Sequence, residues 1–164
     1  MGICGSEILE CIIRPTLHRL GVYNPIAEQL MLGTAAVQSN MGSYLRSSSG
    51  GIGLFGIQHD RHEELWDSYL AFDADLASEI RGFASQHEFL KAPDMELACN
   101  MRYAATIAWM IYVEAGIDLH KLHTTEDLAK CWYELYSRRE AGFSPEDFVM
   151  HYEKLFADCD TQAA

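Results

Sequence analysis

Apolar side chains recur at intervals of three and four residues along most of the chain, which is the spacing of one face of an α-helix. The pattern predicts a helix over 6–14, and Pro15 is expected to kink or end it. Asn24 followed by Pro25 is typical of a helix N-cap and the first helical position. The helix that begins there is expected to end before Asn40.

One stretch, 42–58, breaks the helical spacing. It begins as a serine-rich and glycine-rich loop and continues into an apolar run that contains Gly53 and Gly56. The helical spacing resumes at His59 and extends towards Ile80. We therefore expect an irregular glycine-rich turn between two helical parts of the chain.

The segment 95–115 is the most apolar part of the sequence, and its apolar residues cover more than one helical face. It is predicted to be the central, buried helix, with Gly116 as its C-terminal stop. Thr124 or Thr125 is expected to cap another helix, and Ser144 followed by Pro145 to begin the last one. With no convincing strand pair and no internal repeat, residues 1–164 are predicted to form a single all-α domain.

Composition narrows the possible partners. The 164 residues carry 12 basic and 24 acidic side chains, a net charge of −12, so nucleic acid is not expected as a partner. No stretch approaches the ~20 apolar residues that a membrane span needs. The N-terminus lacks the pattern of a signal peptide, although Gly2 and Ser6 fit a myristoylation motif, which stays open as an alternative.

The five cysteines are odd in number and irregularly spaced, with no C-x-x-C pair, so neither a zinc cluster nor a disulfide framework is expected. Three of them, Cys11, Cys99 and Cys131, fall within apolar helical patterns and are predicted to behave as small buried hydrophobes. Unpaired thiols made in a reducing compartment are the simplest interpretation. We expect no cofactor.

Three motifs occur in a characteristic order. They are Ala35-Ala36-Val37-Gln38-Ser39-Asn40, Gly53-Leu54-Phe55-Gly56-Ile57-Gln58 and Asn100-Met101-Arg102-Tyr103-Ala104-Ala105. Over about residues 24–136 this order resembles the lysozyme-like fold of the soluble lytic transglycosylases and goose-type lysozymes. The form of the chain is most similar to small lysozyme-like proteins of bacteriophage virions and tails.

Two positions depart from the pattern of that family. The catalytic glutamate of the family falls on Gln38, and the glutamine of its glycine turn falls on Gly56. Cleavage of a glycosidic bond needs a carboxylic acid that protonates the leaving oxygen, and an amide cannot supply that proton. We therefore expect little or no cleavage of peptidoglycan by this chain.

The resemblance also implies which residues line the site. Gln38 takes the catalytic position and is expected at the end of its helix, facing a cleft walled by 51–58 and by Tyr103. The other residues implied for substrate binding are Ser39, Tyr44, Gly53, Gly56, Asn100, Tyr103 and Tyr133.

Other polar groups offer weaker alternatives. Asp60, Glu63 and Glu64 could approach the cleft as substitute acids, but acids are common in the first turn of any helix. His59 and His62 lie one helical turn apart, yet they lack the further ligands that zinc requires, so no metal site is expected. His120 and His123 form a similar incomplete pair. The G-x-G-x-x-G string at 51–56 has no strand before it, which argues against a dinucleotide site.

Two functions remain. The first is a virion-associated protein that cleaves or binds the glycan strands of peptidoglycan. The second is a structural component of a phage tail or baseplate that keeps the lysozyme fold without catalysis and contacts other virion proteins. Both imply synthesis in a bacterial host cytoplasm and assembly into a phage particle. Gln38 and Gly56 both favour the second function, since two motif positions are changed together.

Overall fold

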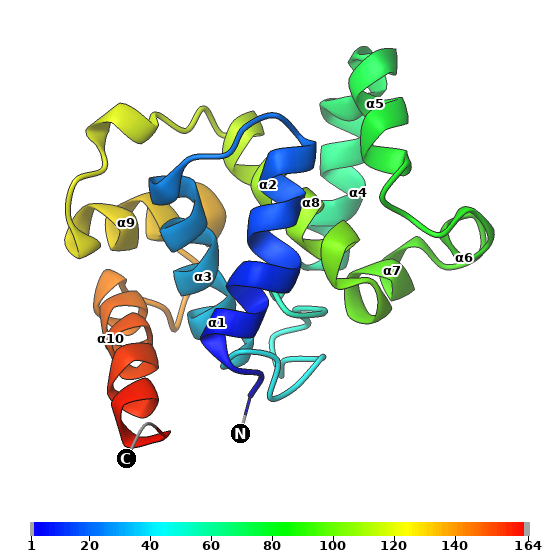
Figure 1. The fold of residues 1–164 in the computed structure, drawn as a ribbon. Helices are drawn as coiled ribbons and strands as arrows, with labels where there is room; N and C mark the ends of the chain where they lie inside the picture. The colour runs from blue at the N-terminus through cyan, green and yellow to red at the C-terminus, as the bar shows by residue number, and fades with distance from the viewer. Residues whose placement is uncertain (1, 163–164) are drawn as a thin grey trace.

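The computed structural model describes residues 2–162, with side chains for residues 2–156, and it confirms an all-α domain (Figure 1). Its helical elements are α1 (Gly5–Ile8), the π-helix η1 (Leu9–Ile13), α2 (Arg14–Arg19), α3 (Pro25–Ser39), α4 (His59–Ser68), the 3₁₀-helix η2 (Leu70–Phe72), α5 (Ala74–Arg81), α6 (Gln86–Phe89), α7 (Pro93–Cys99), α8 (Met101–Glu114), the 3₁₀-helix η3 (Leu119–Lys121), α9 (Thr125–Cys131), the π-helix η4 (Trp132–Tyr136) and α10 (Pro145–Gln162). Among the described residues, extended pairing is limited to isolated bridges from Ile52 to Arg46 and Ile57.

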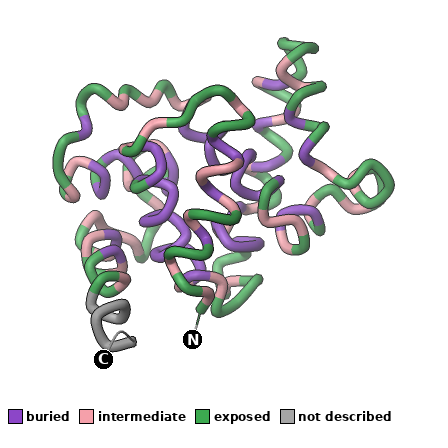
Figure 2. The backbone as a smooth tube through the Cα atoms, viewed as in Figure 1, coloured by how far each residue is buried: buried purple, intermediate pink, exposed green. Residues whose placement is uncertain are grey.

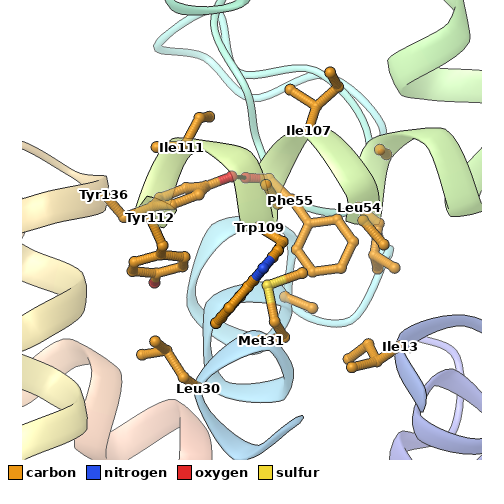
Figure 3. Close-up of a cluster of buried hydrophobic side chains, with 14 of the residues drawn as sticks. Ile13, Leu30, Met31, Leu54, Phe55, Ile107, Trp109, Ile111, Tyr112 and Tyr136 are labelled. Atoms are coloured by element: carbon orange, nitrogen blue, oxygen red, sulfur yellow. Dashed lines mark hydrogen bonds between the residues drawn. The ribbon is translucent and has the colours of Figure 1, made fainter. Parts of the chain in front are cut away.

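Helix α8 lies at the centre of the core (Figure 2). Its Ala104, Ala105 and Ala108 are fully buried, which confirms the predicted central helix. Figure 3 shows side chains of α8 meeting Leu30 and Met31 of α3. Leu54 and Phe55 of the glycine-rich segment join the same cluster. The segment without helical spacing is therefore part of the core and is held there by its apolar side chains.

The prediction of one helix over 95–115 is wrong at its start. The chain is extended at Asn100, which separates α7 from α8. The Asn100 side chain accepts a hydrogen bond from the Tyr103 N–H, and its amide donates to the Phe83 carbonyl and to Glu96. These hydrogen bonds stabilise the break between α7 and α8. The spacing of apolar residues does not predict this break, because apolar residues lie on both sides of it.

Pro15 does not end the first helical run, because α1, η1 and α2 follow one another directly through it. A proline ring needs room beside the carbonyl four residues earlier and leaves that carbonyl without its usual donor. The wide turn of η1 comes immediately before Pro15 and supplies that room. The Thr16 hydroxyl then donates to the Ile12 carbonyl.

Helix starts follow the sequence closely elsewhere. The Asn24 side chain accepts from the Ile26 N–H, and α3 begins at Pro25 and ends at Ser39, as predicted. Thr124 and Asp127 form a reciprocal capping box at the start of α9. The helical spacing from His59 to Ile80 is divided, since α4 ends at Ser68 and Asp73 caps α5 anew.

Only one of the three cysteines predicted to behave as small hydrophobes is buried. Cys131 is buried, as expected of a small hydrophobe, but Cys11 and Cys99 are exposed, so that interpretation is wrong for both. Among the described residues, no helix combines the length and apolar character required to cross a bilayer.

Candidate functional site

A hollow of about 340 Å³ opens where the end of α3, the glycine-rich segment, the start of α4 and the turn after η4 meet. Ile57, Ile111 and Tyr136 supply its apolar wall. Its polar lining consists of Gln38, Gln58, Asp60, Arg61, Glu64, Ser137, Arg138 and Glu140. Segments that lie a hundred residues apart in the sequence therefore contribute to one concave surface.

Gln38 lies in the last turn of α3 and lines this hollow, where the order of the motifs predicts it. It is only 8% exposed, and the hydrogen bonds of the described residues include none to its side-chain amide. Gly56 faces it with a φ of +58°, and a Cβ at that position would stand 2.6 Å from the Gln38 Oε1. A glycine at position 56 thus leaves space for the amide.

Ser39 is buried beside Gln38, but it stabilises the site without facing the hollow. Its hydroxyl donates to the Leu54 carbonyl at 2.7 Å and accepts from the Gly42 N–H at 2.8 Å. The Tyr136 hydroxyl donates to the Phe55 carbonyl at 2.8 Å. The glycine-rich turn is therefore hydrogen-bonded to α3 on one side and to η4 on the other.

Charged side chains connect the two sides of the hollow. Arg61 of α4 contacts Glu64 at 3.0 Å and Glu114 of α8 at 2.5 Å, and Arg138 reaches Glu64 at 2.9 Å. The Gln58 amide donates to Glu140 at 3.0 Å. Hydrogen bonds from Arg61 and Arg138 lower the pKa of Glu64, so this carboxylate holds no proton to give near neutral pH.

The other two candidate substitute acids fare differently. Asp60 lines the same hollow as Gln38. Glu63 lies at a second hollow on the other side of α4. Of the three acids, Asp60 alone combines access to Gln38's hollow with the absence of an arginine partner among the described residues.

Residues with positive φ follow both α3 and η4, the two helical elements that end at the hollow. Asn40 and Met41 follow Gln38 with φ values of +48° and +58°, and Arg138 and Arg139 follow η4 with φ values of +51° and +59°. Side chains other than glycine adopt this region at a cost, and such strain concentrates at functional sites. The π-helix η4 next to Arg138 is a second irregularity of the kind found at such sites.

Several residues implied by the resemblance lie elsewhere. Tyr103 is fully buried and does not line the hollow, so the expectation that it walls the cleft is wrong. Asn100 caps α8 in the interior, and Gly53 packs against the Leu97 carbonyl of α7. Tyr44 is exposed in the loop and Tyr133 is half-buried on η4, and neither lines the hollow.

The buried position of Tyr103 belongs to a hydrogen-bonded chain. The Trp66 indole N–H donates to the Tyr103 oxygen at 2.9 Å, and Tyr103 lies 2.8 Å from His62 Nε2. His62 Nδ1 lies 2.9 Å from Asp94, whose other oxygen contacts His59 at 2.6 Å. Every partner is satisfied when Tyr103 donates to a neutral His62 that donates to Asp94.

This arrangement explains the two histidines without a metal. Within the described part of the chain, no group of three or more histidine, cysteine or carboxylate side chains is placed to hold an ion. His59, His62 and Asp94 instead connect α4 to α7.

Sequence reasoning missed Ser137, Arg138 and Glu140, which line the hollow from the turn after η4. No local motif marks these residues, since their role depends on packing against α3 and α4. The comparisons add no assignment: no family model, curated protein or solved structure matches the chain.

Proposed function

We propose that the chain is a lysozyme-like protein of a phage particle that binds the glycan strands of peptidoglycan in the hollow beside Gln38 without cleaving them. The observation that carries this proposal is the nearly buried Gln38 amide that lines the hollow at the end of α3. The hydrogen bonds of the described residues include none to this amide, so its polar atoms are available to a ligand that enters the hollow.

The lining suits the uncharged hydroxyl and N-acetyl groups of a glycan strand. Asp60 and Glu140 accept hydrogen bonds from hydroxyl groups, and Gln38 can donate one bond and accept another. Ile57 and Ile111 supply apolar surface for the faces of a sugar ring. Because both arginines of the lining already have carboxylate partners, the hollow has no free positive charge to select an anion.

The same geometry argues against turnover. Gln38 carries no ionisable proton, and the lowered pKa of Glu64 keeps this neighbour charged. General acid catalysis contributes roughly 10²–10⁴ to such a reaction, so its loss leaves binding as the retained property. Asp60 could replace the acid only by reaching within ~3 Å of the scissile oxygen.

Calorimetric titration with soluble peptidoglycan glycan strands tests binding. Gln38→Ala is expected to weaken affinity about tenfold, the equivalent of ~1.4 kcal/mol for a lost buried hydrogen-bonding group. Gln29→Ala is the matched control, because Gln29 is an exposed amide on the same helix. Equal affinities of the Gln38→Ala variant and the wild-type chain would contradict the proposal.

A zymogram on purified cell wall tests turnover, with the wild-type chain and Gln38→Glu side by side. We expect no clearing by the wild-type chain. Clearing by Gln38→Glu would show that the hollow retains everything except the acid. Robust clearing by the wild-type chain would refute the assignment of Gln38 to the catalytic position.

A structural role in a phage tail or baseplate is the second candidate. It is favoured by the Glu64–Arg138 ion pair and by the hydrogen bond from Gln58 to Glu140, which hold the two sides of the hollow together. In that case the wild-type chain binds no glycan strand, and neither it nor Gln38→Glu clears the cell wall.

A further inference from the structure

A hollow of about 750 Å³ lies in a groove between α9 and α10 and shares no lining residue with the hollow beside Gln38. Figure 1 shows these two helices together at one side of the molecule, opposite α4 to α7. The groove residues, which we call the α9–α10 face, are Glu126, Ala129, Lys130, Pro145, Glu146, Val149, Met150, Glu153 and Lys154.

The apolar centre of the α9–α10 face is open to solvent. Met150 is 58% exposed and stands beside the half-buried Val149. The opposite side of α10 is already used, since Phe148 is buried against Gly33 of α3 and Tyr152 stacks on Phe148. An exposed methionine in an apolar groove is typical of a surface that packs against another protein.

The face carries both signs of charge, and one glutamate and one lysine of α10 are spaced so that two copies could pair them. Glu146, Met150 and Lys154 are spaced four residues apart along α10 and all line the groove. When two copies of α10 lie antiparallel about a two-fold axis at Met150, Glu146 of each copy stands opposite Lys154 of the other. The two methionines then meet at the centre, and both ends form ion pairs.

We propose that the α9–α10 face is the surface through which two copies of this chain associate, with their α10 helices antiparallel across Met150. The chain has twice as many acidic as basic residues, which opposes self-association over most of its surface. On this face three acids are accompanied by two lysines, so the net charge of the face is close to zero and repulsion between two copies is weak there. A strongly basic partner would select a uniformly acidic face, whereas a glutamate and a lysine at equal distances on either side of Met150 suit an isologous contact.

Sedimentation equilibrium of the full chain over about 10–300 μM tests the proposal, since a micromolar dissociation constant would give a dimer in this range. We expect the wild-type chain to dimerise. Glu146→Lys sets lysine against Lys154 at both ends, and Lys154→Glu sets glutamate against Glu146 at both ends. Each single reversal is expected to raise the dissociation constant at least about tenfold.

The double variant Glu146→Lys/Lys154→Glu restores opposite charges at both ends and is expected to dimerise within about threefold of the wild-type chain. Glu79→Lys is the control for changed net charge, because Glu79 is exposed on α5, away from the face. Circular dichroism of every variant confirms folding. A monomeric wild-type chain at 300 μM, or a double variant as weak as the single ones, would overturn the proposal.

Discussion

His59 and His62 lie three residues apart on α4 and share the Asp94 carboxylate, yet their proton affinities change in opposite directions. Burial lowers the pKa of His62 and outweighs the effect of Asp94. The hydrogen bond to Asp94 raises the pKa of His59, which remains in solvent. Burial alone would raise the pKa of Asp94, but its hydrogen bonds with His62 and His59 outweigh this and lower it.

The raised pKa of His59 gives a pH-dependent stability with a definite sign. Its contribution is complete below the unfolded-state pKa of about 6.5 and is lost as the pH rises through the higher folded-state pKa. His59→Ala is therefore expected to lower the urea midpoint more at pH 5.5 than at pH 8. Equal losses at both pH values would show that the His59–Asp94 pair does not stabilise the fold.

Gly53 is required for steric reasons in the glycine-rich turn. Its φ is +74°, and a Cβ there would collide with the Leu97 carbonyl of α7. Gly53→Ala is expected to cost about 3 kcal/mol in urea unfolding, because it adds overpacking to backbone strain. Gly21→Ala is the control, with a φ of +68° and open space around its Cβ, and should cost only about 1 kcal/mol. Similar losses in the two variants would contradict the close packing of the turn on α7.

At the scale of elements, α3 and α10 pack closely against each other at Gly33. Gly33 lies in the middle of α3, where glycine weakens a helix, and the ring of Phe148 occupies the space of its missing side chain. Phe148 stacks on Tyr152 and contacts Trp132, so this one position connects α3, α10 and η4. Glycine at position 33 thus lowers the helix propensity of α3 but allows α3 and α10 to pack closely.

Gly33→Ala tests this packing through the sign of its effect. Helix propensity alone predicts a gain of about 1 kcal/mol, whereas overpacking against Phe148 predicts a loss that leaves the variant about 2 kcal/mol less stable. Urea unfolding of Gly33→Ala, Phe148→Leu and the double variant completes a cycle. We expect the alanine to cost less when Phe148 is leucine, and a stabilised single variant would refute the contact.

At the scale of the whole molecule, Cys131 offers a probe of global unfolding. It is buried between α9 and the core, and burial raises the pKa of its thiol to about 12. Only the thiolate reacts with alkylating reagents, so Cys131 should react at pH 8 only after unfolding. Peptide mass mapping over a urea series should show Cys4, Cys11 and Cys99 modified in the native state. Modification of Cys131 without urea would show that this region opens locally.

The sequence by itself determined the all-α class, the starts of α3, α9 and α10, and the position of the buried helix. These features depend on local chemistry, since Asn24, Thr124 and Pro145 act on the turns that follow them. The sequence also predicted Gln38 at the end of its helix, and Gln38 and Gly56 of the glycine-rich turn line one hollow.

Only the tertiary structure decided which residues share a surface. It buried Tyr103 with His62 and Trp66, where the sequence placed it in the cleft, and it supplied Arg138 and Glu140 to the hollow from a turn without a motif. In the tertiary structure the first helical run continues through Pro15, and the apolar segment 95–115 is divided into two helices at Asn100. The physical reason is the same in each case. Hydrogen bonds and packing between segments distant in sequence outweigh the local helix propensity, and the spacing of apolar residues along the chain does not reveal these contacts.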